Sequence, residues 1–237
     1  MHALSLAKQS RFCVPEPIGI WAEGGVLWTP EVLGETVRSS IKARCPPQPE
    51  HLLNGLSQLW SSIDSSKAVE GRPLDLLGGY QMSRDLLEHV VQNDDGRRQL
   101  ESITDALGPF AKAWRPSYLA HNDFHDDQLI FTPEGELALI DFEEIGPGDP
   151  LIDVGTILAH LHWMAHFSAT PEAFKAYREQ IRSIALSSFG WNPEDLDTRE
   201  AYALFRLSSG PTRQLKGKWA EQVDAVLAID CQLLGKA

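Results

Sequence analysis

The stretch Tyr118–Asp153, YLAHNDFHDDQLIFTPEGELALIDFEEIGPGDPLID, decides how the rest of this chain is interpreted. Two short apolar runs, 129–131 and 137–140, are predicted strands. The residues between them, 132–135, predict a tight turn, because Pro presets φ and Gly accepts a positive φ. Such a hairpin brings the residues before its first strand next to those after its second.

Asp123 precedes the first strand and Asp141 follows the second, so we expect their carboxylates to be neighbours. Magnesium prefers oxygen ligands and keeps waters and substrate phosphates as its remaining ligands. Phosphoryl transfer requires charge neutralisation and a carboxylate that accepts the proton of the attacking hydroxyl. The pair therefore indicates phosphoryl transfer. Each residue also has a local interpretation, since a loop Asp is usually a turn or cap residue and Asp141 could merely end a strand.

The segments HNDFHDDQLIF and LIDFEEIGPGDPLIDVG resemble the catalytic core of the aminoglycoside phosphotransferase / choline kinase family. These are small-molecule kinases with a protein-kinase-like fold. The family pattern is His-x-Asp-x-x-x-x-Asn, then a hydrophobic residue and Asp followed by Phe or Trp, then Gly-Asp-Pro-x-x-Asp. Three spaced elements agree in order and context, whereas any one alone would be weak. The resemblance covers roughly residues 14–36 and 115–165.

This resemblance implies a role for each matching residue. Asp123 would be the catalytic base that orients the acceptor hydroxyl, and Asp141 would hold the Mg²⁺ that bridges the phosphates of ATP. Gln128 falls where the family has a second metal-binding Asn, and it keeps the carboxamide oxygen one methylene further out. His121 would brace the loop, and Asp153 would brace the loop backbone from the start of the next helix.

Asp149 and Pro150 have a local role in the same stretch. Asp149 is a predicted helix N-cap, and Pro150 suits the first helical position. Together with His121 and Asp153, Asp149 is therefore assigned to structural support of the loop. His125 is predicted to be an exposed loop histidine.

The expected fold is α+β and protein-kinase-like, with a truncated small β lobe and a mainly α-helical large lobe that contains the catalytic β-hairpin. Residues 1–36 are predicted to be a remnant of the small lobe and hinge, and residues 37–237 the large lobe. A second hairpin is predicted over 18–29. It resembles the last small-lobe strands, so the hinge that receives adenine is expected near Pro30 to Leu33.

About a dozen residues precede Val14, too few for the family's phosphate-covering loop and its lysine-bearing strand at ordinary element lengths. Lys8 lies in a predicted helical piece and is not assigned the lysine's role. This short start indicates a truncated or displaced gene start, or a degenerate kinase.

Apolar residues at helical spacing predict the helices of the large lobe. They fall near 52–63, 82–91, 100–114, 154–166, 174–184 and 219–234. Pro109 should kink or divide the third of these. His162 and His166 share a helix face at a spacing that zinc can use. No third ligand accompanies them, so they are predicted to lie at the core edge or surface.

A formal net charge of −12 disfavours binding to nucleic acid or to an anionic membrane. No apolar run is long enough to span a bilayer, and the start lacks the apolar core of a signal peptide. Cys13, Cys45 and Cys231 fit neither a zinc spacing nor a disulfide framework. A reducing cytoplasm is therefore the expected location.

The predicted function is transfer of a phosphoryl group from ATP, with Mg²⁺, to a hydroxyl of a small molecule. A sugar, an aminoglycoside, a choline-like alcohol and an amino alcohol all remain open, because fold does not fix substrate. The alternative is a catalytically degenerate, kinase-like binding or regulatory protein. A third hypothesis is a metal-dependent hydrolase. Its candidate ligands are His121, Asp123, His125, Asp126 and Asp127, and it leaves the LIDFEE and GDPLID elements without a role.

Overall fold

The structure is a computed structural model that describes residues 12–62, 72–213 and 219–236. Most of the described part of the chain is helical, and within it short antiparallel strands form three small sheets. The predicted α+β class is confirmed. The first helical piece expected before Val14 lies mostly outside the described residues.

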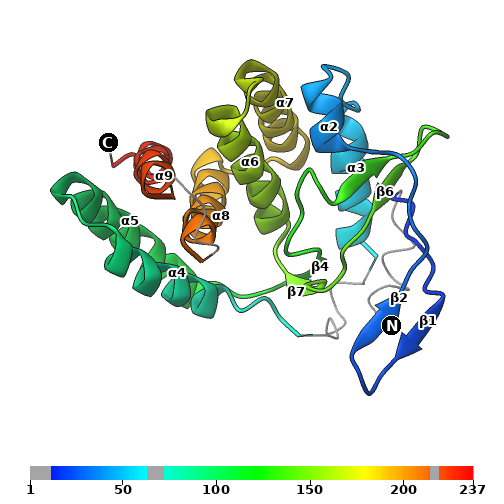
Figure 1. Ribbon diagram of the computed structural model, residues 1–237, viewed down its shortest axis with the longest axis horizontal. Helices are drawn as coiled ribbons and strands as arrows, with labels where there is room; N and C mark the ends of the chain where they lie inside the picture. Colours follow the sequence, from blue (N-terminus) through cyan, green and yellow to red (C-terminus); the bar gives the residue numbers. More distant parts are fainter. Residues whose placement is uncertain (1–11, 63–71, 214–218, 237) are drawn as a thin grey trace.

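The predicted N-terminal hairpin is present as β1 (Gly19–Trp21) and β2 (Val26–Trp28), which pair antiparallel. Gly25 lies in its turn with a φ of 63°, a conformation that glycine adopts without strain. Figure 1 shows this hairpin at one edge of the molecule, at the opposite end from α5 and α9. Trp21 and Trp28 are both about half exposed there.

The predicted catalytic hairpin is also present, as β5 (Leu129–Phe131) and β6 (Leu137–Leu139). A two-residue strand, β3 (Glu35–Thr36), extends this sheet on the β5 side. On the other side, Cys13 exchanges backbone hydrogen bonds with Leu137 and Leu139. Residues from before position 36 thus border the hairpin directly, and the division into two lobes at that position stays a prediction.

A third pairing joins β4 (Tyr118–Ala120) to β7 (Gly146–Gly148) in antiparallel register. The sequence reasoning did not predict β7, because Gly-Pro-Gly has low strand propensity. Its backbone is nevertheless paired, and Ser117 extends the contact by donating its N–H to Gly148 O at 2.8 Å. The pairing fixes both ends of the stretch that holds the catalytic hairpin.

The predicted helices are present in the predicted order, and the short helix α2 was not predicted. Their bounds are α2 (Val37–Lys42), α3 (Pro49–Trp60), α4 (Leu76–Val90), α5 (Asp94–Ala113), α6 (Pro150–Phe167), α7 (Pro171–Phe189), α8 (Pro193–Arg213) and α9 (Trp219–Leu233). Met82 begins the apolar pattern that predicts the helix near 82–91, but it is 60% exposed on α4 and so lies outside the buried face. Ile63, the last apolar residue in the pattern that predicts the helix near 52–63, lies outside the described residues.

Pro109 lies inside α5, which continues through it to Ala113, so the predicted division of this helix did not occur. Proline removes one helical hydrogen bond and crowds the preceding turn. Here the buried face of α5, including Ile103 and Leu107, packs into a hydrophobic cluster that holds the helix on both sides of the proline. Tertiary packing therefore outweighs the local preference.

Helix α6 is the centre of the helical part. Every residue from Ile152 to Ala159 is buried, and α7 and α8 pack against it (Figure 1). Its Val154, Ile157 and Leu158 belong to the same hydrophobic cluster as Leu129 and Leu139 of the catalytic hairpin. Hairpin and helix therefore form one core, which places the start of α6 directly behind the loop before β5.

Candidate active site

The loop between β4 and β5 begins in an unusual backbone conformation. Asn122 has a φ of 67°, and Asp141, just after β6, has a φ of 63°. Both values lie in the left-handed region, which Asn and Asp tolerate better than most residues. The two bends turn the loop and the end of the hairpin toward each other.

Asp123, Gln128 and Asp141 converge there. The Gln128 amide nitrogen donates to Asp123 Oδ2 at 3.0 Å and to Asp141 Oδ2 at 3.2 Å. Gln128 is buried, Asp123 is half-buried and Asp141 is exposed. Burial raises the pKa of Asp123, and His125 and Arg206 act against that rise. The hairpin thus brings together two acids that are eighteen positions apart.

Asp153 lies behind this loop with no solvent exposure. Its carboxylate accepts hydrogen bonds from the backbone N–H of His121 at 3.0 Å and of Asn122 at 2.7 Å, and from the indole N–H of Trp60 at 2.9 Å. Burial raises the pKa of Asp153 to about 6, and these three donors limit the rise. The carboxylate therefore fixes the backbone just before Asp123.

His121 is fully buried within the loop. Its Nε2 lies 3.2 Å from Ile140 O, which links the loop to the end of the hairpin. Burial lowers the pKa of His121 to about 4, so the ring is neutral near pH 7 and carries its proton on the nitrogen that faces the carbonyl. The rings of Phe124 and Phe142 pack edge-on against it.

Asn122 is a positioning residue that the sequence reasoning missed. Its amide donates to Glu144 O at 2.8 Å, which ties the loop to the segment before β7. A Cβ at Gly148 would lie 2.0 Å from Asn122 Oδ1, so only glycine leaves room for this contact. The Gly-Pro-Gly sequence after an acidic run was the available signal, because a side chain can come this close to the backbone only where that backbone carries glycine.

Asp149 caps α6 as predicted. Its Oδ1 accepts the N–H of Leu151 at 2.9 Å, and Pro150 occupies the first turn. Its Oδ2 faces Arg199 of α8 at 3.3 Å. Asp149 thus supports the start of α6, which carries Asp153, and among the described residues its carboxylate bonds to Leu151 and Arg199 and not to the loop.

His125 is not the exposed loop histidine that the sequence predicted. Its side chain is only 16% exposed, because its ring stacks on His160 of α6 with centroids 4.2 Å apart and planes 4° apart. Its Nδ1 lies 3.3 Å from the Asp127 N–H, and its Nε2 lies 3.9 Å from Asp123 Oδ2. Only the tertiary fold brings His160 to this position.

Asp126 is fully buried and is held by Arg38 of α2. The guanidinium donates through Nε and Nη2 to both carboxylate oxygens, each at 2.8 Å, and Nη1 pairs with Asp127. This bidentate pair anchors the far side of the loop to α2. The sequence offered no signal for it, since the partners are 88 positions apart.

The donor set suits magnesium. Gln128 Oε1 is buried with no hydrogen-bond partner, and two carboxylates lie within reach of the same amide. Turning the amide over exchanges its nitrogen and oxygen, so the side chain can present an oxygen beside Asp141 to a hard cation. A carboxylate and a carboxamide are ligands that Mg²⁺ accepts, and waters and substrate phosphates commonly complete its coordination.

The ligand set of the hydrolase hypothesis does not converge. His121 Nε2 faces a carbonyl, and Asp126 is held on both oxygens by Arg38. Within the described part of the chain, the group of metal-ligating types that lies closest together is His125, Asp126 and His160. This group shares only His125 and Asp126 with the ligand set of the hydrolase hypothesis, and Arg38 holds both carboxylate oxygens of Asp126.

Comparison with known proteins agrees with this geometry. The model of the phosphotransferase enzyme family matches residues 2–193, so the chain belongs to that family. No curated protein matches the chain. Solved structures that resemble it share its protein-kinase-like fold.

Three such structures illustrate the likeness. A choline/ethanolamine kinase family protein from Mesorhizobium loti is 18% identical with a TM-score of 0.63, over 98% of this chain and 76% of its own. The aminoglycoside phosphotransferase APH(4)-Ia is 13% identical with a TM-score of 0.66, over 98% and 81%. An ethanolamine kinase from Plasmodium vivax is 12% identical with a TM-score of 0.61, over 100% and 72%.

Proposed function

We propose that this protein transfers the γ-phosphoryl group of ATP to a hydroxyl of a small molecule. The observation that carries the proposal is the convergence of Asp123 and Asp141 on Gln128 at the end of the hairpin. Family membership supports phosphotransfer in general. Complexes of neighbouring structures with AMP, or with AMP-PNP and hygromycin B, support a nucleotide and a small-molecule acceptor.

In this proposal, Asp123 accepts a hydrogen bond from the acceptor hydroxyl and aims its oxygen at the γ-phosphorus. An O–P bond forms as the bond from the γ-phosphorus to the bridging oxygen breaks, and ADP leaves with that electron pair. The hydroxyl proton passes to Asp123. Burial of Asp123 raises its pKa, which makes the carboxylate a better proton acceptor than a solvated one.

Asp141 and Gln128 would hold Mg²⁺, which when bound neutralises charge on the phosphates. His121, Asn122 and Asp153 keep the loop backbone fixed, so that Asp123 has one position relative to the acceptor. Preorganised positions of this kind account for most of the catalysis expected in phosphoryl transfer.

We also propose a cytoplasmic setting. All three cysteines are free in the structure, as expected in a reducing compartment. No helix in the described ranges has the length and apolar character needed to cross a membrane.

Titration calorimetry with ATP, with and without Mg²⁺, tests the proposal. The wild type is expected to bind ATP in a magnesium-dependent manner, and Asp141→Asn is expected to weaken that binding at least about tenfold, because the metal loses an anionic ligand. Asp123→Asn should largely keep binding but lose turnover by about 10²-fold or more. Glu134→Gln, an exposed change in the hairpin turn, is the matched control.

Full turnover in both aspartate variants would rule out the proposed mechanism. A folded wild type that binds no Mg·ATP would favour the alternative, a kinase-like binding or regulatory protein.

A further inference from the structure

His125 is held at a fixed place in the loop between β4 and β5, because the core immobilises both of its neighbours. Phe124 is fully buried, and Asp126 is fully buried and held on both carboxylate oxygens by Arg38. The carbonyl of His125 accepts the N–H of Gln128 at 3.1 Å, which closes a turn of the loop. The backbone at His125 is thus fixed, and the direction of its ring depends on the contacts of the ring itself.

Two contacts orient this imidazole ring. One face stacks on His160 of α6, with ring centroids 4.2 Å apart and planes 4° apart. The backbone N–H of Asp127 donates to Nδ1 at 3.3 Å. A ring nitrogen that accepts a hydrogen bond presents a lone pair, so in the neutral ring the proton lies on Nε2. The helix therefore fixes the plane of the ring, and the loop fixes which nitrogen can donate.

That donor faces the candidate catalytic base. His125 Nε2 lies 3.9 Å from Asp123 Oδ2, and the Gln128 amide nitrogen donates to the same oxygen at 3.0 Å. The separation of 3.9 Å exceeds a hydrogen bond, but such contacts often shorten only once substrate is bound. Among the described residues, both side-chain contacts of this carboxylate end on Oδ2, so Oδ1 is the oxygen left for an acceptor hydroxyl.

Gln128 cannot serve Asp123 and a metal ion at the same time. The amide must turn over to present its oxygen to Mg²⁺ beside Asp141, and its nitrogen then leaves Asp123 Oδ2. Of the described side chains that contact this oxygen, His125 is the one that still offers a donor.

We infer that His125 is a positioning residue for phosphoryl transfer, whose Nε2–H donates to Asp123 Oδ2 and so turns Oδ1 toward the acceptor hydroxyl. This inference rests on the proposed function and adds a residue to its site. His160 supports the same arrangement, because its stack holds the plane of the His125 ring. A carboxylate fixed in one orientation favours the transition state without contacting the nucleotide, so the effect falls on kcat.

Intrinsic hydrolysis of ATP tests the inference without an identified acceptor, because water then takes the place of the acceptor hydroxyl. His125→Leu removes the donor and is expected to lower kcat about tenfold or more, with the KM for Mg·ATP unchanged within about twofold. His125→Gln keeps an N–H donor near the position of Nε2 and should recover most of that loss. His51→Leu, exposed on α3, is the matched control, and thermal unfolding shows whether each variant is folded.

The imidazole signals give a readout that does not depend on turnover. In protein labelled with ¹⁵N at histidine, the signals lost in His125→Gln identify those of His125, and their chemical shifts show which nitrogen carries the proton. We expect the proton on Nε2, and we expect its signal to move in Asp123→Asn, which removes the charge that it faces. Glu134→Gln, in the exposed hairpin turn, should leave the signal unchanged.

A His125 ring without a proton on Nε2, or with signals that do not respond to Asp123→Asn, overturns the inference. A folded His125→Leu variant with the wild-type kcat overturns it as well, and so does a His125→Gln variant that is no more active than His125→Leu. Where the wild type binds Mg·ATP but hydrolyses it too slowly to measure, the histidine signals alone decide.

Magnesium-dependent ATP binding is measured by calorimetry in the same preparations. If that binding is present and the tests of His125 fail, only the role of His125 is wrong. If the wild type binds no Mg·ATP, the proposed function itself fails.

Discussion

Two fully buried carboxylates show how differently this fold treats negative charge. Asp153, behind the candidate catalytic loop, is surrounded by neutral donors, and burial raises its pKa to about 6. Glu200, in the helical part, accepts two hydrogen bonds from Arg178 at 2.7 Å each and one from His162 at 3.0 Å. Burial acts on Glu200 as well, yet these partners lower its pKa.

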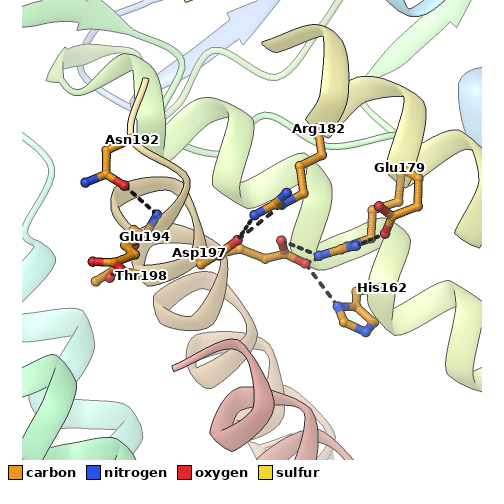
Figure 2. Close-up of polar contacts among 9 residues, drawn as sticks. His162, Glu179, Arg182, Asn192, Glu194, Asp197 and Thr198 are labelled. Carbon is orange, nitrogen blue, oxygen red and sulfur yellow. Dashed lines mark hydrogen bonds and ion pairs between the residues drawn. The ribbon is translucent and has the colours of Figure 1, made fainter. Parts of the chain in front are cut away.

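The Glu200 network joins three helices. Figure 2 shows His162 from α6, and Glu179 and Arg182 from α7, gathered against the start of α8, where Arg182 meets Asp197 at 2.7 Å. A cation from a neighbouring helix compensates the buried charge, so this network connects helices. Around Asp153 the compensation comes from backbone N–H groups, so that carboxylate shapes a loop. The comparison shows that the role of a buried carboxylate depends on the kind of partner and not on burial alone. Cationic side chains accompany the carboxylate that joins helices, and neutral N–H donors accompany the one that holds the loop of the candidate site.

The largest expected effect on stability comes from breaking the Glu200 network. Glu200→Gln leaves the Arg178 guanidinium buried without a full counter-charge, and we expect a loss of about 3–5 kcal/mol in the free energy of unfolding. Urea unfolding measures it. Glu179→Gln, which removes a largely exposed partner of the same arginine, is the matched control and should cost less than about 1 kcal/mol. Equal losses of unfolding free energy in the two variants would contradict the conclusion that Glu200 is the main counter-charge of Arg178.

The contributions of Asp153 and Glu200 to the free energy of unfolding should change with pH in opposite directions. The folded pKa of Asp153 is raised from 3.8 to about 6, so its contribution to stability is complete below about pH 4 and is lost as pH rises to about 6. This difference between the folded and unfolded pKa of Asp153 corresponds to about 3 kcal/mol in the free energy of unfolding. The lowered pKa of Glu200 gives the reverse, a loss as pH falls below 4.5.

Unfolding curves of wild type, Asp153→Asn and Glu200→Gln between pH 3 and pH 7 test these signs. Other buried acids such as Asp230 also titrate, so the difference between each variant and wild type is the relevant quantity. Differences that do not change with pH would show that neither carboxylate contributes as described.

Asp153→Asn at pH 7 is expected to destabilise the protein by about 1–3 kcal/mol, because the amide cannot accept all three N–H donors and leaves one facing its own NH₂ group. Turnover should fall further than stability explains, since the backbone before Asp123 loses its anchor. Trp60→Phe removes only the indole donor and should lower the free energy of unfolding by about 1 kcal/mol. A fully active, fully stable Asp153→Asn protein would refute this role.

The smallest effect is expected at the pair of Arg182 and Asp197, which lies near the surface with both side chains partly exposed. Water screens this pair, so Asp197→Asn should cost about 0.2–1 kcal/mol. The loss should shrink further in high salt. A loss comparable to that of Glu200→Gln would mean that the pair belongs to the buried network.

Much of the candidate site could be predicted from the sequence. Turn chemistry at 132–135 and the apolar runs on either side were sufficient to place Asp123 near Asp141. The cap at Asp149 also followed from its position before Pro150. These are short-range features, and short-range rules of turns and caps hold in most contexts.

The errors arose where distant residues compete with local preference. His125 was assigned to the surface because nothing near it in the sequence indicates that His160 will cover it. Pro109 was expected to kink or divide its helix, and packing keeps that helix continuous through the proline. Met82 fits the apolar period of α4 but falls outside the face that is buried.

By itself, then, the sequence determined the order of elements, the hairpin and the acids at its ends, because these depend on residues a few positions apart. The tertiary structure decided which partners those residues meet. Arg38 reaches Asp126 across 88 positions, Trp60 reaches Asp153 across 93, and His160 of α6 stacks on His125. Periodicity fixes which face of a helix is buried but not what it is buried against, and the chemistry of a site depends on the latter.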